Sequence, residues 1–319
     1  MAVEQNGSKG NKSKSTSDLF AAEGITLLAA AFWGTSFIVV ELGLEIINPF
    51  WFAQLRFLVA ALGALLVVVV LRKRIERKLI LSHWIWLLGL FNALGFFGQF
   101  VGQTMTNATK TALLINLNLV TVALLSMVII GEHFSKKKGF AVLVSIFGVF
   151  LLTTNGDLSQ LTSGEFIGDM FALAGGFSWA FYIVTNKKVV SQPEIDIVTL
   201  TACVMLTTTI LMIPITLIFG GISLDVLSIG FEGAQFVIYL GIFCNVIPFL
   251  LWTYGLRRLP ATASTLLLLA EVFVAAILAM LILGEFLTLI GLVGGGFIVL
   301  AIIIISFDSK NNRRNRGRK

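Results

Sequence analysis

One acidic residue stands apart from every other charge in this chain. Glu271 follows the apolar run Leu266–Ala270, and no charged residue lies within ten positions of it on either side. A carboxylate near the centre of a bilayer costs about 2.5 to 3.5 kcal/mol on insertion scales and usually faces the interior of a helix bundle. Because burial disfavours the charged form, such a group can exchange a proton or bind a cationic group. The alternative is a Glu held by neighbouring helices for packing alone.

The same stretch of sequence occurs twice. At a shift of 153 positions the two copies match over about 40 residues without a gap, and Glu271 falls on Asn118. Repetition at a fixed period indicates that one structural unit is used twice. The polar and Gly pairs at this shift are Asn92 with Asn245, Gly102 with Gly255, and Gly131-Glu132 with Gly284-Glu285.

The composition is that of a chain surrounded by lipid. Apolar residues make up 57% of the chain and charged residues only 13%. A helix needs about 20 apolar residues to cross about 30 Å of hydrocarbon, and continuously apolar stretches such as Val67–Val70 favour helices over the alternating strands of a barrel. We therefore expect an all-α polytopic membrane protein with ten transmembrane helices, near residues 24–42, 50–71, 84–103, 107–130, 139–154, 166–186, 197–219, 233–255, 260–283 and 286–306.

The basic residues are distributed unevenly between the loops. Of the 23 Lys and Arg residues, 21 lie before the first span, in every second loop, or after the last span. Since Lys and Arg collect in cytoplasmic loops, this pattern predicts that both termini are cytoplasmic and that the protein is a multi-pass protein of the plasma membrane. The two exceptions are Arg56 and Lys110, which fall within spans.

Each repeat contains five spans, an odd number, so the second copy must enter the membrane inverted. We assign 21–155 to the first repeat and 156–307 to the second, with a polar cytoplasmic segment at 1–20, expected to be disordered, and a basic cytoplasmic tail at 308–319. Inverted repeats that rock around a central cavity are common in transporters. Channels and enzymes also contain repeats, so alternating access is inferred here by analogy.

Polar and aromatic residues of other spans are candidates to surround Glu271. Asn118 and Asn116 lie at its depth in the other half, and Trp33 and Trp179 each lie in the first helix of a half. For the Trp pair, an aromatic wall facing substrate and plain interhelical packing are equal alternatives. Arg56 either snorkels to the interface or binds a substrate carboxylate. The expected substrate-binding residues are Glu271, Asn116, Asn118, Trp33, Trp179, Tyr182, Gln99, Asn245 and Arg56.

The sequence contains no motif that indicates an enzyme. Cys203 and Cys244 lie inside predicted helices, His83 and His133 lie at loops, and neither a zinc motif nor a hydrolase motif occurs. We therefore expect no catalytic residue, no metal and no cofactor. The basic tail is interpreted as a topology signal with anionic-lipid contact, and no nucleic-acid partner is expected.

Several short motifs resemble those of one transporter family. They are Phe32-Trp33-Gly34, Leu55-Arg56-Phe57, the stretch Leu251–Ala263, Leu269-Ala270-Glu271 and Leu283-Gly284-Glu285. On these motifs the chain, from about residue 24 to 306, resembles the EamA family of the drug/metabolite transporter superfamily. The resemblance implies ten helices in two inverted five-helix repeats, a central cavity between the halves, and export or uptake of small metabolites. One departure is Val272, where the family commonly has Pro, so the kink that Pro would impose is not implied here.

Three classes of function follow. The first is a secondary transporter, with export the expected direction, for small organic metabolites such as amino acids, working by alternating access and either proton-coupled or facilitative. The second is a passive pore or lipid scramblase. The third, an intramembrane enzyme or receptor, lacks a catalytic constellation, and a nucleotide-sugar or phosphate-ester carrier would need more cations than Arg56 and Lys110. The expected partners are a small-molecule substrate and the lipid bilayer, and a homodimer is an open alternative.

Overall fold

The computed structural model describes residues 16–130, 136–159, 163–222 and 229–316, and within these ranges every regular element is a helix. Eight helical segments of this part of the chain are long and apolar enough to cross a bilayer, and two shorter apolar helices, 139–152 and 289–301, complete a set of ten. The all-α, ten-span architecture is therefore confirmed. Glu132 of the repeated signature lies outside the described residues.

The first half supplies five spans and one short connecting helix. They are α1 (Thr16–Leu44), α2 (Pro49–Val70), the connecting α3 (Arg77–Ile80), α4 (His83–Gln103), the pair α5 (Ala108–Asn116) and α6 (Asn118–Ile130), and α7 (Lys136–Thr154).

The second half also supplies five, three of them with π-helical turns. They are α8 (Gly164–Val190), α9 (Ile197–Ile215) with η2 (Thr216–Gly220), the span of α10 (Gly230–Gly241), η4 (Ile242–Val246) and α11 (Ile247–Arg258), the span of α12 (Ala261–Leu268), α13 (Ala270–Leu278) and η5 (Ala279–Leu283), and α14 (Leu289–Arg316).

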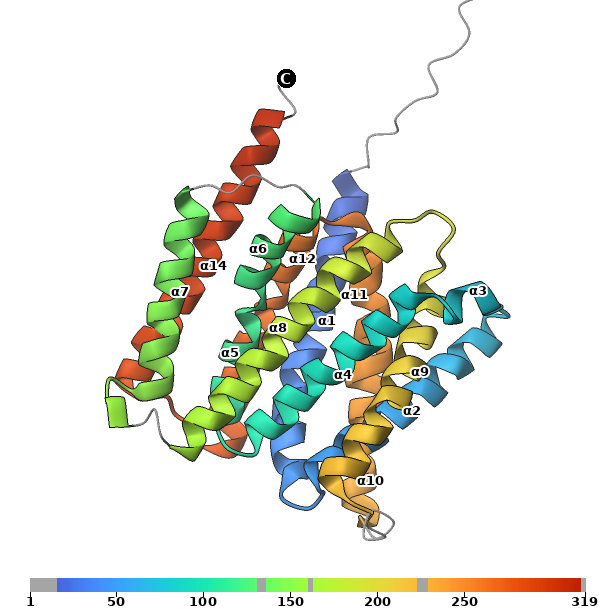
Figure 1. Cartoon of the computed structure of the whole chain (residues 1–319), viewed down its shortest axis with the longest axis horizontal. Coiled ribbons are helices and arrows are strands. Elements are labelled where there is room, and N and C mark those ends of the chain that lie inside the picture. Colours follow the sequence, from blue (N-terminus) through green and yellow to red (C-terminus); the bar gives the residue numbers. More distant parts are fainter. Residues whose placement is uncertain (1–15, 131–135, 160–162, 223–228, 317–319) are drawn as a thin grey trace, which may run out of the picture.

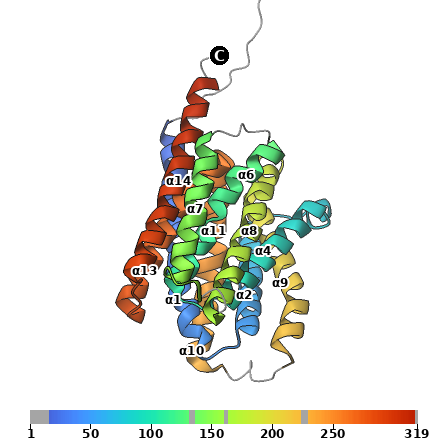
Figure 2. The ribbon, with the colours of Figure 1, turned by 60° about the vertical axis from the view of Figure 1, so that its left-hand side comes forward.

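The two halves enter the bundle from opposite faces (Figure 1). Helix α1 begins and α14 ends at one face, named here the terminal face, whereas α8 begins at the opposite face. The first helix of each half packs on the third span of the other, α1 on α11 and α8 on α4. Helix α14 lies beside α7 along one edge (Figure 2). These contacts between the first helix of one half and the third span of the other join the halves at the centre of the bundle.

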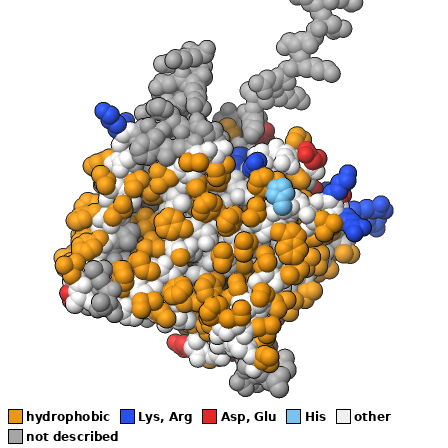
Figure 3. Space-filling view, in the orientation of Figure 1, with side chains coloured by type: hydrophobic (Ala, Val, Ile, Leu, Met, Phe, Trp, Pro, Cys, Tyr) orange, Lys and Arg blue, Asp and Glu red, His pale blue; other side chains and the backbone are white. Residues whose placement is uncertain are grey.

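The outside of the bundle is apolar. Hydrophobic side chains cover most of the face seen in Figure 3, and the charged ones lie near its rim. Large side chains such as Val69, Ile218 and Phe273 are more than half exposed. A soluble protein would rarely expose so continuous an apolar surface, so this surface is the part that contacts lipid.

The crossing of α4 and α8 depends on glycine. A Cβ on Gly98 would lie 2.6 Å from the Phe171 carbonyl oxygen and 2.7 Å from the Gly175 backbone nitrogen. Small residues let membrane helices approach to backbone contact, where van der Waals packing holds them together. These glycines therefore bring the third span of one half against the first helix of the other.

Gly34 plays the same part between α1 and α13. A Cβ there would lie 2.6 Å from Cβ of Val274 and 2.8 Å from the backbone oxygen of Glu271. The glycine of the Phe32-Trp33-Gly34 motif thus allows α1 to lie directly against the turn of helix that carries Glu271.

Two spans are broken at matching places in the two repeats. Helix α5 gives way to α6 at Leu117, and α12 gives way to α13 at Leu269. Each break is a tight turn, with Leu117 N–H donating to Leu114 O at 3.2 Å and Leu269 N–H donating to Leu266 O at 3.1 Å. The ninth span is therefore interrupted without the Pro that the family commonly has there.

We predict that Gly34→Ala lowers the unfolding temperature, because the new methyl group overlaps Val274 and the backbone of Glu271. Overpacking of this kind costs about 1 to 3 kcal/mol. Thermal unfolding of detergent-purified protein measures the change. Gly24→Ala in the same helix is the control, since a Cβ at Gly24 meets nothing within 4 Å. An equal loss in both variants would contradict the packing role of Gly34.

Candidate functional site

A cavity lies between the two halves, with walls from α1, α4, α5, α6, α8, α11, α12 and α13. Its volume is about 60 Å³, several times the roughly 10 to 15 Å³ that one water molecule needs. Seven of the nine residues expected at a substrate site line it: Glu271, Asn116, Asn118, Trp33, Trp179, Tyr182 and Gln99.

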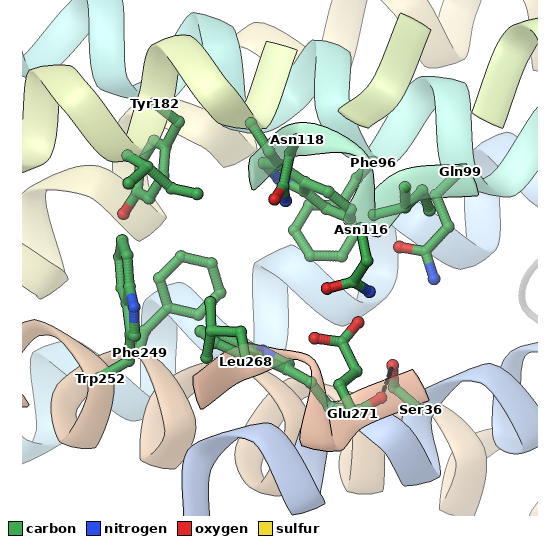
Figure 4. A pocket seen from close by; sticks show the side chains of 14 residues that line it. Ser36, Phe96, Gln99, Asn116, Asn118, Tyr182, Phe249, Trp252, Leu268 and Glu271 are labelled. Carbon is green, nitrogen blue, oxygen red and sulfur yellow. Dashed lines mark hydrogen bonds between the residues drawn. The ribbon is translucent and has the colours of Figure 1, made fainter. Parts of the chain in front are cut away.

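Glu271 lies in the first turn of α13, directly after the break at Leu269, and is 8% exposed. Its carboxylate faces the amide of Asn116 (Figure 4). No Lys or Arg occurs among the described residues that line the cavity. The wall thus carries one acidic group with no basic group to neutralise it.

Aromatic rings form the other end of the cavity. In Figure 4, Tyr182, Trp252 and Phe249 lie at the end away from Glu271. The rings of Tyr182 and Trp252 are stacked, with centroids 5.9 Å apart and an angle of 25° between planes, and Trp33 meets Phe249 edge-on at 5.2 Å. The cavity therefore has a polar end and an aromatic end.

The two Trp residues both line the cavity and hold the halves together. The indole N–H of Trp33 donates to the Cys244 carbonyl at 2.9 Å. That carbonyl would bond the N–H four residues later in a regular helix, but position 248 is Pro, which has none. Trp179 donates to the Asn92 side-chain oxygen at 3.4 Å. Lining and packing, which the sequence left as alternatives, are combined in the same side chains.

Arg56 and Asn245 do not line the cavity. Arg56 is fully buried and donates from Nη2 to Oδ1 of Asn245 at 2.6 Å. Its guanidinium carbon lies 4.6 Å from the ring centroid of Phe96, a residue of the cavity wall, and it also contacts Phe57 and Phe100. Three aromatic rings therefore hold this cation inside the bundle, so that it reaches neither the membrane interface nor the cavity.

The other intramembrane cation is neutralised locally. Lys110 lies 3.0 Å from a carboxylate oxygen of Asp169 and 3.5 Å from one of Glu165. Both partners are on α8, so the ion pairs tie the start of α5 to the first helix of the second half. Lys110 is thus accounted for by structure and takes no part in the cavity.

The expected substrate site left out seven lining residues: Ser36, Phe96, Ile115, Ile183, Phe249, Trp252 and Leu268. Helical spacing could have found two of them. Ser36 follows Trp33 by three positions, and Phe96 precedes Gln99 by three. Residues three apart share a helix face.

Glu285 holds the outer end of a helix whose inner end is in the cavity. Its carboxylate accepts hydrogen bonds from the backbone N–H groups of Ala108 at 3.3 Å and Thr109 at 3.2 Å. These are unpaired donors at the start of α5, where a negative charge is favourable. The far end of this nine-residue helix carries Asn116.

Both halves of the chain match the model of the EamA-like transporter family, over residues 21–154 and 166–307. The chain belongs to the EamA-like transporter family. It is therefore a multi-pass membrane protein of a family of transporters, as the motifs around Trp33, Arg56 and Glu271 indicate.

Relatives with the same description occur in archaea and bacteria. An "Uncharacterized transporter" of Archaeoglobus fulgidus is 32% identical over 285 residues, which cover 88% of this chain and 94% of the relative. The "Uncharacterized transporter YdfC" of Bacillus subtilis is 28% identical, covering 84% of this chain and 85% of the relative. A solved crystal structure matches with a TM-score of 0.65 at 17% identity, covering 91% of this chain and 98% of its own, so the likeness there is one of fold.

We predict that Trp33→Phe destabilises this EamA-like protein by about 1 to 3 kcal/mol, because it removes the donor that the indole supplies to the Cys244 carbonyl. Thermal unfolding measures the loss. The loss should shrink in a Pro248→Ala background, where residue 248 regains an N–H that can bond the same carbonyl. Equal losses in both backgrounds would show that Trp33 acts only through the bulk of its ring.

Proposed function

We propose that this protein is a secondary transporter that carries a small organic metabolite through the central cavity by alternating access. It lies in the plasma membrane with the terminal face toward the cytoplasm, the side on which the basic loops of the sequence fall. The observation that carries the proposal is a cavity shared by two inverted halves, with a single acidic group and no basic group in its described wall.

Alternating access requires a closure at each face that can open. At the terminal face, α8 and α11 cap each other. Lys187 of α8 donates to the carbonyls of Leu256 at 2.6 Å and Leu259 at 2.8 Å, at the end of α11. Arg257 of α11 donates to Val190 O at 2.8 Å, at the end of α8. Each helix end thus supplies the cation that the other helix end favours.

This reciprocal pair lies close to the aromatic end of the cavity. Lys187 follows Tyr182 by five positions, and Arg257 follows Trp252 by five. Helices α8 and α11 therefore bring the stacked rings and the reciprocal caps together at one end of the substrate path. Separation of the two helix ends would open the cavity toward the terminal face.

A different set of contacts closes the opposite face. Glu285 holds the start of α5, Lys110 joins α5 to α8, and Gln103 donates to the carboxylate of Glu41 at 2.9 Å. These contacts join other helix ends than the caps at the terminal face, so one face can open while the other stays closed.

Glu271 is the proposed coupling group. A carboxylate can hold a proton or a cationic group, but not both at once. Exchange of a proton for substrate at this residue would couple proton movement to substrate movement. Both can reach Glu271 only from the side of the membrane to which the cavity is open.

We predict that Glu271→Gln slows transport by about tenfold or more, because a charge-assisted hydrogen bond contributes about 1.5 to 3 kcal/mol. The measurement is uptake of radiolabelled amino acids, amines, nucleosides and sugars into proteoliposomes, with and without a pH gradient. The gradient should accelerate only the protein with Glu271.

The matched control is Glu45→Gln, which removes an exposed acid at the opposite face. It should transport like the unaltered protein. Identical rates for Glu271→Gln and the unaltered protein would refute the role of Glu271, and rates that never saturate with substrate would identify a pore.

We further predict that Arg257→Met opens the terminal face, because the end of α8 loses its cap. Ile183→Cys, introduced into the cavity wall of a protein in which Cys203 and Cys244 are Ala, reports the opening. A membrane-impermeant maleimide applied at the terminal face should label it several times faster in the Arg257→Met protein.

Arg258→Met is the control, since Arg258 donates to Tyr254 of its own helix at 3.3 Å. Equal labelling in the two variants would argue against a closure made by Arg257.

A further inference from the structure

The polar atoms of the cavity wall that lack partners point to one class of solute. We propose that the cavity accepts an aromatic amine: a protonated nitrogen at the Glu271 end, a flat ring in the middle, and a neutral hydrogen-bond acceptor at the far end. This inference rests on the proposed transport function and names the substrate class of the same cavity.

The first argument is the set of acceptors at the polar end. The carboxylate of Glu271 lies there, and so does Asn118, whose Oδ1 is buried without a hydrogen-bond partner among the described residues. A buried acceptor left unpaired costs about 1 to 3 kcal/mol. An ammonium group carries three donors and no acceptor, so it satisfies Asn118 and pairs with Glu271 at once.

The second argument is the donor at the aromatic end. Trp252 is 1% exposed and lines the cavity, and its indole N–H has no partner in the described part of the chain. An indole nitrogen can only donate. A hydroxyl or carbonyl oxygen on the far end of the solute would satisfy it.

The third argument concerns the body of the solute. Between the two ends the wall is formed mainly by a ring and aliphatic side chains, among them Phe96 and Leu268. Aromatic pairs stack or meet edge-on with a gain of about 0.5 to 1.5 kcal/mol beyond the area they bury. A flat ring therefore fits this part of the cavity better than a sugar, whose hydroxyl groups would find few partners.

The charge of the wall fixes the end at which the amine lies. Glu271 is the acidic group of the wall, and the Arg56 guanidinium packs on Phe96 without reaching the cavity. A carboxylate on the solute would find no cation in the wall, and beside Glu271 it would be repelled.

The test uses solutes with a shared ring and different ends: tyramine, phenethylamine, tyrosine and 3-(4-hydroxyphenyl)propionate. Each is added to purified full-length protein, and its dissociation constant is obtained from the concentration dependence of the unfolding temperature. We expect tyramine to bind best, phenethylamine about three to ten times more weakly for lack of one hydrogen bond, tyrosine more weakly still, and the propionate not at all.

Two variants separate the two ends. Glu271→Gln should weaken tyramine and phenethylamine alike, by about tenfold or more. Trp252→Phe should weaken tyramine alone and make the two amines equal. Asn118→Leu, which leaves Glu271 in place, provides a second test of the polar end if Glu271→Gln protein is not folded.

The outcomes distinguish this inference from the transport function. If tyrosine or the propionate binds more tightly than the amines, or if none of the four binds while proteoliposomes move another solute, the amine class is wrong and the transporter stands. If Trp252→Phe leaves the difference between the amines intact, the far-end contact is wrong. If no solute binds and none is transported, the proposed function fails with it.

Discussion

In hydrocarbon, every backbone N–H and C=O must find a partner inside the protein, and this constraint determines where the cavity lies. Regular α-helix is interrupted near the cavity at Leu117, at Leu269 and in the π-helical turn Ile242–Val246, which precedes Pro248. At the first two, tight turns replace the lost bonds. At the third, the indole of Trp33 supplies the donor that Pro cannot. The breaks need polar neighbours, and they adjoin the residues that line the cavity. The carboxylate of Glu271 and the amides of Asn116 and Asn118 therefore lie where the backbone already requires polar groups.

Inversion of one unit produces two polar clusters that correspond closely. In the first, Trp179 donates to Asn92, which donates to Thr208 at 3.1 Å. In the second, Trp33 donates to the carbonyl beside Asn245, and Asn245 accepts from Arg56. Each cluster joins the first and second spans of one half to the third span of the other. The same arrangement of hydrogen bonds thus joins the halves twice, once with the hydroxyl of Thr208 and once with the guanidinium of Arg56.

Length and apolar runs were enough to predict ten helices, because a bilayer requires about 20 apolar residues per span. The repeat shift was enough to relate Asn118 to Glu271, since both lie at one depth. The sequence did not indicate how each helix is rotated about its axis. Arg56 was placed at the site for its charge, but three Phe rings hold it away from the cavity. Phe96 and Phe249 were overlooked because an apolar ring in a membrane helix carries no signal of its own. The break at Leu269 was not implied either, because it forms without Pro.

The repeat also bears on whether Glu271 is needed for packing. Asn118 occupies the corresponding place in the other half, and it carries no charge. The span there is broken between α5 and α6, as the ninth span is broken between α12 and α13. The fold can therefore form this junction with an amide. A carboxylate in the second copy carries a cost of about 2.5 to 3.5 kcal/mol on insertion scales, which the architecture does not require. Arg56 presents the same contrast with Thr208. Glu271 and Arg56 thus break the internal symmetry, one on the wall of the cavity and one behind it. Together they place an electric field across the cavity, which an amide and a hydroxyl would not supply.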